Sequence, residues 1–508
     1  MDYIAGIDIG TTNIKGSLFS SKGELISTAS IDYPSFTPQE GFHEQNPDDW
    51  VNGFINVLSE LLVSDDISQN LKAIGISTQG GTLVPVDRNF NPLYNAITWL
   101  DRRGSQILNE YNFLKEKNIE VYLKTGWRLD SGLSFLALWW LKENKKEIFN
   151  KIYKVLYVND YLLKKITGNN IQDPSNASIT LFYNVKETKW DDVLLSFFNF
   201  NSNKLSEVKN PGVFVGYLND ECLKRLKIKA DSKIKVFNGS HDQYCVGLGN
   251  GIFSEDEILL ATGTAWVIFQ MLNKPILDDK KFFAVGRFTF KQHFIQNFGN
   301  NLEPIQDINF EDKFGMIYTI PTGGASVRWF ANNILNLKNE KQLFDIISSN
   351  SEYLLTLKNN VIFHPYLSGA WGPDFDISRK ASFSNLELSH NYLDLIKALL
   401  EGVGFQLRKI FNVLSEKGIK PSSIKMVGGG SRDKIWPQII ADINKKEIFI
   451  PEDPKLDFAT RGAAILAGFG AGVFNSFEEG YERLKVNYKS VKPNHQNLSF
   501  YDEKFKLF

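Results

Sequence analysis

The chain has 508 residues, of which 43% are hydrophobic and 23% are charged, and its formal net charge is −1. This length accommodates at least two domains with a sizeable core. The small net charge argues against a general electrostatic attraction to nucleic acid or to an anionic membrane. Two cysteines exclude a disulfide framework and a cysteine-based zinc site. The sequence shows neither a secretory leader nor an apolar run of about 18 residues, so we expect a cytoplasmic protein.

The first twenty residues predict a β-hairpin with a polar turn. Two apolar runs flank the segment Asp8-Ile9-Gly10-Thr11-Thr12. Gly10 lacks a Cβ and lets the backbone approach a ligand, and the two threonine hydroxyls can donate hydrogen bonds to phosphate oxygens. The carboxylate of Asp8 suits a hydrated Mg²⁺. A plain hairpin with a polar tip is the alternative, and this stretch by itself supports both interpretations equally.

Strand, glycine-bearing loop and helix alternate along the first half of the chain. A helix is predicted from Pro47, with Asn46 as its N-cap, because apolar residues then recur at helical spacing. Residues 73–77 predict a buried strand that opens into the polar loop 78–82. This alternation predicts an α/β fold.

Two further stretches place polar residues at the ends of predicted strands. Trp99 and Asp101 stand beside two arginines, and from this stretch alone we favour a capped strand with a surface ion pair over a polar pocket. The strand 234–237 leads to His241 and Asp242 before a glycine-rich helix, which is where α/β proteins place ligand groups. We interpret His241 as a packed imidazole and Asp242 as a functional carboxylate.

The second half of the chain repeats features of the first. Residues 258–268 resemble the opening hairpin, with hydroxyl residues in the turn, and residues 423–431 resemble residues 71–80. This internal similarity predicts a duplicated domain with a boundary near residue 250. Two facing turns, one from each half, would hold the two ends of a polyphosphate.

Two glycine-rich turns of the second half also favour ligand binding. Gly323 and Gly324 precede a helix that we expect to begin near Val327, and a helix N-terminus favours an anion. The run 428–430 consists of three glycines after a predicted strand, so a flat group can lie against the backbone there. Asp433 or the lysine after it would reach the edge of that group.

The order and spacing of these stretches resemble the FGGY family of carbohydrate kinases over nearly the whole chain. The matching segments are residues 6–12, 43–50, 96–99, 239–243, 261–264, 401–403 and 428–442. The resemblance implies an α/β protein of two duplicated ribonuclease-H-like domains, of the actin, sugar kinase and chaperone ATPase type, around a nucleotide cleft. Residues 1–250 would carry the sugar side, the phosphate hairpin and the catalytic aspartate. Residues 251–508 would carry the nucleotide side.

The same resemblance implies phosphoryl transfer from Mg²⁺-bound ATP to a sugar hydroxyl. Asp242 would be the general base, and Asp8 would lie near Mg²⁺. Closure of the two domains would position the reactants and exclude water. The residues assigned to the nucleotide, from the phosphates to the adenosine, are Thr11, Thr12, Lys15, Thr262, Gly263, Thr264, Gly323, Gly324, Gly429, Gly430 and Asp433.

The acceptor sugar is predicted from the remaining site residues. The candidates are Gln79, Trp99, Asp101, Asp242 and Gln243. Two glycines follow Gln79, where glycerol kinases place Arg-Glu and xylulokinases place Met-His. This departure argues against glycerol and weakens the case for D-xylulose itself. We therefore predict phosphorylation of a ketose, a pentulose or hexulose, by an enzyme similar to xylulokinases or fuculokinases.

Other functions stay open at this point. A sugar-acid (gluconate) or polyol kinase of the same family is one, with Arg102 and Arg103 as donors to a carboxylate. An actin-like or chaperone-like ATPase that phosphorylates no sugar would need no base at position 242. A catalytically silent sugar-binding regulator fits poorly with an intact Asp8 and Asp242. The expected partner is a small-molecule sugar, without nucleic acid or membrane, and a homodimer is left open.

Overall fold

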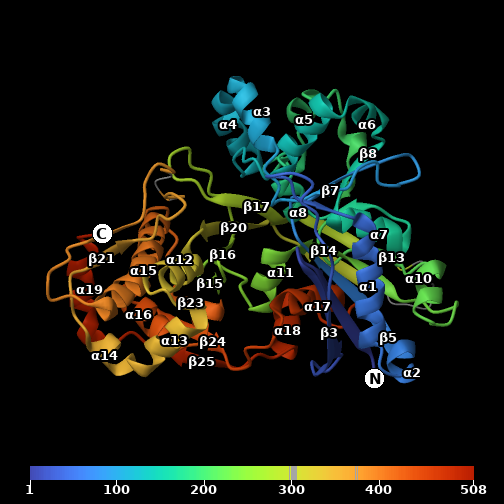
Figure 1. The fold of residues 1–508 in the computed structure, drawn as a ribbon. Helices are drawn as coiled ribbons and strands as arrows, with labels where there is room; N and C mark the ends of the chain where they lie inside the picture. The colour runs from blue at the N-terminus through green and yellow to red at the C-terminus, as the bar shows by residue number, and fades with distance from the viewer. Residues whose placement is uncertain (297, 299–305, 372, 374–375) are drawn as a thin grey trace.

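Two mixed β-sheets, one from each half of the chain, organise the molecule (Figure 1). A computed structural model describes residues 1–296, 298, 306–371, 373 and 376–508. None of the helices in these ranges has the length and apolar content needed to span a bilayer.

The first sheet has the strand order β13-β14-β5-β1-β2-β3. The predicted hairpin is formed by β1 and β2, which pair in antiparallel fashion, whereas β5 runs parallel to β1 and β14 runs parallel to β5. The carboxyl ends of β1, β5 and β14 therefore meet at one edge of the sheet. Its strands are β1 (Tyr3–Ile9), β2 (Asn13–Ser20), β3 (Leu25–Asp32), β5 (Leu71–Thr78), β13 (Phe214–Tyr217) and β14 (Lys235–His241).

The second sheet repeats this arrangement in the order β17-β20-β16-β15-β23-β24-β25. Its hairpin β15–β16 corresponds to β1–β2, and β23 and β24, which follow in parallel, correspond to β5 and β14. The similarity of residues 258–268 and 423–431 to the first half thus coincides with equivalent strands. The strands are β15 (Glu257–Thr262), β16 (Trp266–Leu272), β17 (Ala284–Thr289), β20 (Lys313–Ile320), β23 (Ser423–Gly428), β24 (Glu447–Pro451) and β25 (Tyr488–Val491).

Smaller sheets and the helices surround these two sheets (Figure 1). One small sheet has four strands, in the order β4 (Glu44–Gln45), β7 (Ala96–Ile97), β6 (Leu83–Val86) and β8 (Lys154–Tyr157). The other short strands form two-stranded sheets: β9 (Ile171–Gln172) with β12 (Glu207–Val208), β10 (Tyr183–Asn184) with β11 (Lys189–Trp190), β18 (Gln292–Gln296) with β19 (Gln306–Phe310), and β21 (Ile362–His364) with β22 (Ser382–Ser384). The α-helices are α1 (Pro47–Leu61), α2 (Asp65–Asn70), α3 (Gly104–Glu110), α4 (Asn112–Thr125), α5 (Ser134–Asn144), α6 (Lys146–Lys151), α7 (Val158–Thr167), α8 (Pro174–Ile179), α9 (Asp192–Ser196), α10 (Asp220–Arg225), α11 (Asp242–Gly249), α12 (Gly323–Trp329), α13 (Glu340–Ser349), α14 (Ser351–Thr356), α15 (Tyr392–Glu416), α16 (Ile435–Asn444), α17 (Phe458–Gly470), α18 (Phe477–Arg483) and α19 (Leu498–Phe505).

Helices α11 and α17 lie between the two sheets and contact each other (Figure 1). Helix α17 follows β24 of the second sheet, yet it packs on β1 and β5 of the first. The approach is close: a Cβ on Gly6 would lie 1.8 Å from the carbonyl oxygen of Thr460, and one on Gly75 would lie 1.9 Å from that of Ala463. Packing thus extends across the predicted boundary near residue 250.

We expect Gly6→Ala to lower the free energy of unfolding by about 1–3 kcal/mol, because the added methyl group must displace the backbone of α17. The measurement is equilibrium unfolding in urea. Gly263→Ala is the control, since the nearest atom to its Cβ would be 3.4 Å away, and it should leave stability unchanged. A Gly6→Ala protein as stable as the wild type would show that α17 does not dock on β1 in this way.

Candidate active site

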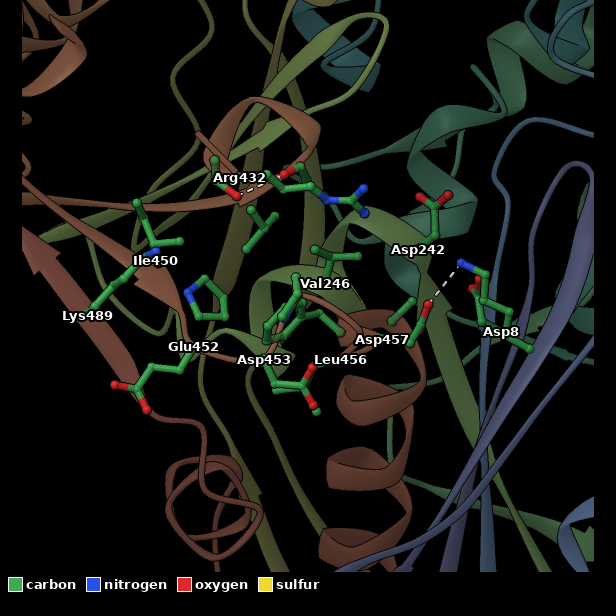
Figure 2. Close-up of a pocket in the computed structure, with 18 residues that line it drawn as sticks. Asp8, Asp242, Val246, Arg432, Ile450, Glu452, Asp453, Leu456, Asp457 and Lys489 are labelled. Atoms are coloured by element: carbon green, nitrogen blue, oxygen red, sulfur yellow. Dashed lines mark hydrogen bonds and ion pairs between the residues drawn. The ribbon is translucent and has the colours of Figure 1, made fainter. Parts of the chain in front are cut away.

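A cavity of about 480 Å³ lies between the two halves of the chain (Figure 2). From the first half it is lined by Asp8 and Lys15 of the hairpin β1–β2, and by Asp242 and Val246 of α11. The lining residues from the second half are Val427, Gly428, Ser431, Arg432, Ile450, Pro451, Glu452, Asp453, Pro454, Leu456, Asp457, Phe458, Ala459 and Lys489. Apart from Lys489 on β25, these lie at the carboxyl ends of β23 and β24 or in the segments that follow them, where an α/β sheet is expected to bind ligands.

Asp8 stands at the end of β1 and is 7% exposed. Its carboxylate accepts a hydrogen bond of 2.6 Å from the Ser77 hydroxyl on β5. Burial, followed by repulsion from Asp457 and Asp242, raises the pKa of Asp8 to about 8, although Ser77 and Lys15 oppose the shift. Three carboxylates thus share a site where a cation would relieve their repulsion.

The raised pKa of Asp8 predicts how the free energy of unfolding of the ligand-free protein depends on pH. The folded state keeps the Asp8 proton up to about pH 8, whereas the unfolded chain loses it near the usual 3.8, so the free energy of unfolding falls as pH rises between these values. We expect Asp8→Asn to flatten this fall and to be more stable than the wild type near pH 8. Urea unfolding near pH 5 and near pH 8, without divalent cations, measures both. An identical slope in the two proteins would contradict the shift.

Lys15 and Asp457 join the two halves across the cavity by an ion pair of 3.0 Å (Figure 2). Asp457 also accepts the backbone N–H of Thr460 at 2.9 Å and so caps α17. Asp457 is not among the site residues predicted from the sequence. The internal duplication is the signal that could have revealed it. Strand β24 is the equivalent of β14, and Asp457 stands just before the helix that follows β24, much as Asp242 begins the helix that follows β14.

Asp242 is the first residue of α11 and lines the cavity (Figure 2). Its Oδ1 atom is buried and has no hydrogen-bond partner in the described chain, although Nε2 of His241 lies 3.3 Å away. The amide oxygen of Gln243 is likewise buried without a donor there. Buried acceptors without donors are costly, so a ligand that supplies O–H groups fits this position.

Most of the predicted phosphate residues of the second half gather around one turn. The Thr262 hydroxyl donates to the carbonyl oxygen of Val427 at 2.6 Å and accepts the N–H of Gly430 at 3.0 Å, so it holds the glycine run in place. Gly263 and Thr264 are exposed at the tip of the hairpin β15–β16. These two residues are the exposed part of this turn, although the carbonyl oxygen of Thr264 accepts the backbone N–H of Ala325 at 2.8 Å.

The turn at Gly323 and Gly324 packs against this hairpin. A Cβ on Gly324 would lie 2.2 Å from the carbonyl oxygen of Gly263, and one on Gly323 would lie 2.4 Å from the Trp266 ring. The expected helix start near Val327 is wrong, because α12 begins at Gly323 itself. The close contact with Trp266 requires glycine at that helix start.

Asp433 supports the start of a helix. Its Oδ1 atom accepts the backbone N–H groups of Ile435 and Trp436 at 2.7 and 2.8 Å, at the beginning of α16. Burial raises the pKa of Asp433. Its other carboxylate oxygen is buried without a partner in the described residues, so one acceptor stays available there.

Gln79 supports the turn of the hairpin β1–β2 from inside the protein. It is 2% exposed, and its amide nitrogen donates to the carbonyl oxygen of Gly10 at 3.3 Å and to Oε1 of Gln45 at 3.0 Å. Trp99 approaches the same turn, since its indole N–H donates to the Thr11 hydroxyl at 3.0 Å. Trp99 is 40% exposed and can still meet a ligand, whereas the amide of Gln79 is used internally.

Asp101 lies inside the protein, in an ion pair with Arg103. Its carboxylate accepts from the Arg103 guanidinium at 2.8 and 2.9 Å and from the backbone N–H of His43 at 2.6 Å. Arg103 also bonds to Glu44 at 2.7 Å, and its side chain is fully buried. The ion pair between Asp101 and Arg103 is therefore buried, and the surface ion pair expected in this stretch is formed by its other arginine. Arg102 is the exposed arginine, and it pairs with Asp130.

Three predicted site residues, Asp8, Lys15 and Asp242, line the cavity together. Sequence reasoning missed Arg432, whose guanidinium extends across the cavity toward the side where Asp242 lies (Figure 2). The predicted residues outside the lining of this cavity are Thr11, Thr12, Gln79, Trp99, Asp101, Gln243, Thr262, Gly263, Thr264, Gly323, Gly324, Gly429, Gly430 and Asp433.

The acidic side of the cavity suits a hard cation such as Mg²⁺. Within the described ranges, no group of three or more His, Cys, Asp or Glu side chains has the geometry of a complete metal site. Mg²⁺ commonly binds through one or two carboxylates together with substrate phosphates, and does not need such a cage. Asp8, with its unfavourable buried charge, is the residue that fits this role.

Comparisons with known proteins agree with this architecture. A model of the N-terminal domain of the FGGY family of carbohydrate kinases matches residues 3–249, and the model of the C-terminal domain matches residues 289–471. The chain is 29% identical to a xylulose kinase of Lactococcus lactis over 519 residues, covering 100% of this chain and 96% of that protein. It is 26% identical to a gluconokinase of Bacillus subtilis over 498 residues, covering 96% and 91%.

The fold is shared with solved structures. The crystal structure of ligand-bound xylulose kinase from Lactobacillus acidophilus matches with a TM-score of 0.85 at 23% identity, covering 100% of this chain and 97% of that chain. The predicted α/β fold of two similar domains is thereby confirmed. Because the two family models together match well over half of the sequence, the chain belongs to the FGGY family of carbohydrate kinases and is, as the sequence predicts, a carbohydrate kinase.

Proposed function

We propose that this kinase transfers the γ-phosphoryl group of MgATP to a hydroxyl of a five- or six-carbon ketose, with Asp242 as the general base. One observation carries the proposal: Asp242 lines the cavity that also contains Asp8 and Lys15, and its buried Oδ1 atom accepts no hydrogen bond from the described residues, with Nε2 of His241 3.3 Å away. A carboxylate so placed can accept the proton of an acceptor hydroxyl.

The proposed reaction needs little covalent help from the protein. The acceptor oxygen attacks the γ-phosphorus, its proton passes to Asp242, and the bond from the γ-phosphorus to the bridging oxygen breaks, so that ADP leaves. Lys15 and Arg432 supply positive charge for the phosphates from opposite sides of the cavity. Mg²⁺, held near Asp8, would neutralise further phosphate charge. The exposed backbone of Gly263 and Thr264 would contact the phosphates from the second half.

The state of the two arginines favours a ketose over a sugar acid. Arg103 is buried against Asp101 and Glu44, so its guanidinium does not reach a substrate carboxylate. Arg102 is exposed and already paired with Asp130 at 3.3 Å. Gluconate therefore lacks the strong cationic partner that we would expect in its site. The match to a gluconokinase of Bacillus subtilis keeps gluconate in the experimental panel.

The domain division proposed from the sequence, residues 1–250 and 251–508, has support from the family models. The N-terminal model ends at residue 249 and the C-terminal one begins at residue 289. Each half also contributes one of the two sheets.

A coupled ADP-release assay with purified protein and MgATP tests the function. The acceptors are D-xylulose, L-fuculose, D-gluconate and glycerol, each compared with a reaction that contains no acceptor. We expect a ketose to give the highest kcat/KM. A preference for gluconate or glycerol would overturn the substrate class. ADP release at one rate with and without every acceptor would instead indicate an ATPase.

A further inference from the structure

Gly80 leaves room for the imidazole ring of His241, the residue that directly precedes Asp242. A Cβ added to Gly80 would lie 2.4 Å from Cδ2 and 2.7 Å from Nε2 of His241. Both distances are shorter than van der Waals contact, and the third neighbour, Cδ1 of Ile179, is 3.3 Å away. Any side chain at position 80 would therefore displace the His241 ring. The two residues come from the ends of neighbouring parallel strands, because His241 pairs with Thr78.

The backbone and ring of His241 are held in a defined position. Its N–H donates to the Ser175 hydroxyl at 2.9 Å, and its ring meets Tyr244 edge-on, with 5.9 Å between ring centroids. Its Nε2 atom lies 3.3 Å from Oδ1 of Asp242. The His241 side chain is 9% exposed, so a ring nitrogen sits beside the proposed base while the ring stays largely buried.

The neighbouring polar atoms point to a polyhydroxylated ligand. Oδ1 of Asp242 and Oε1 of Gln243 are both buried without a hydrogen-bond donor in the described chain. Trp99 lies beside the residue that follows Gly80, since a Cβ on Gly81 would be 3.6 Å from the Cβ of Trp99. A hydroxyl donates to an acceptor and accepts from an N–H, so adjacent sugar oxygens can satisfy Asp242 and His241 together.

We propose that His241 and Gly80 form one specificity element for the acceptor. The imidazole, which occupies the volume that a side chain at position 80 would fill, binds the sugar oxygen next to the hydroxyl that gives its proton to Asp242. The acceptor class is thus a compound with oxygens on two adjacent carbons at the phosphorylated end. This inference rests on the proposed function, and it adds a second protein contact to the acceptor.

The test is a double-mutant cycle with Gly80→Ala, His241→Phe and the double variant. Phenylalanine keeps a ring in the site but lacks the nitrogen atoms. We expect each single variant to raise the KM for the ketose by about tenfold and the KM for ATP by less than about twofold. In the double variant the effects should not add, because Gly80→Ala acts by displacing a ring that can no longer bind sugar.

A second comparison keeps the proposal falsifiable if Gly80→Ala does not fold. His241→Gln retains a donor and acceptor near the position of Nε2, and it should recover part of the ketose KM that His241→Phe loses. The inference is overturned if His241→Phe and His241→Gln behave alike, if the ketose and ATP KM values rise together, or if the Gly80 and His241 effects are additive. The proposed function fails separately, when the wild-type protein phosphorylates none of the acceptors.

Discussion

Replacement of Asp242 by asparagine is expected to lower kcat for phosphoryl transfer by about 10²- to 10⁴-fold, the usual contribution of a general base. Asparagine has nearly the same shape but cannot take a proton from the acceptor hydroxyl. ATP binding should change by less than about twofold, because the role proposed for Asp242 is toward the acceptor and not toward the nucleotide. Steady-state ADP release with the best acceptor measures the first effect, and calorimetric titration with MgATP measures the second.

Asp453→Asn is the matched control for this experiment. Asp453 lines the same cavity, but its carboxylate accepts the backbone N–H of Lys455 and lies on the loop that follows β24. The same chemical change there should leave kcat within about threefold of the wild type, since no proton transfer is assigned to it. A fully active Asp242→Asn protein would remove the base from the mechanism, whereas equal losses in both variants would indicate a general electrostatic effect.

Replacement of Lys504 by methionine should lower the free energy of unfolding by about 3–5 kcal/mol, the cost of leaving a buried charge without its partner. Lys504, on the last helix, donates to Glu401 at 2.5 Å, and both side chains are 1% exposed. Tyr501 donates to the same carboxylate at 3.0 Å, and Lys397 lies 3.6 Å from it. With Lys504 removed, Lys397 stays beside Glu401, but its ammonium also donates to the carbonyl oxygen of Leu354 at 2.6 Å, so it compensates only in part.

The control for Lys504 lies on the same terminal segment. Lys506 pairs with Glu503 at 2.7 Å, but the Lys506 side chain is 67% exposed and that of Glu503 is 72% exposed. Exposed pairs contribute little to stability, so Lys506→Met should leave the urea midpoint unchanged. Equal midpoints for Lys504→Met and the wild type would contradict the buried pair. Combining Lys504→Met with Glu401→Gln should recover part of the loss, since the unpaired charge is then gone.

Local patterns in the sequence were sufficient for the main elements. The opening hairpin, the long helix α15 and the helix after Gly428–Gly430 all follow from apolar periodicity, turn glycines and capping residues, which act over a few neighbouring positions. The repeat between the halves also emerged from the sequence, because equivalent strands keep similar apolar runs and turns. Asp8 and Asp242 were identified through their places in these patterns and Lys15 through the family resemblance, and all three line one cavity.

The roles of other polar residues depended on partners far along the chain. Gln79 and Asp101 have the chemistry of sugar ligands, but their groups bond to Gly10 and to Arg103 inside the protein. Asp457 and Lys15 are 442 positions apart in the sequence, and no periodicity connects them.

By itself, therefore, the sequence determined the α/β class, the internal duplication, the family and the position of the acidic residues at strand ends. Only the tertiary structure decided which side chains are free to meet a ligand, and that His241 occupies the space left by Gly80. The physical reason is the distance along the chain over which each interaction acts. Backbone propensity and apolar periodicity depend on neighbouring residues, whereas hydrogen-bond satisfaction and steric fit depend on segments that meet only after folding.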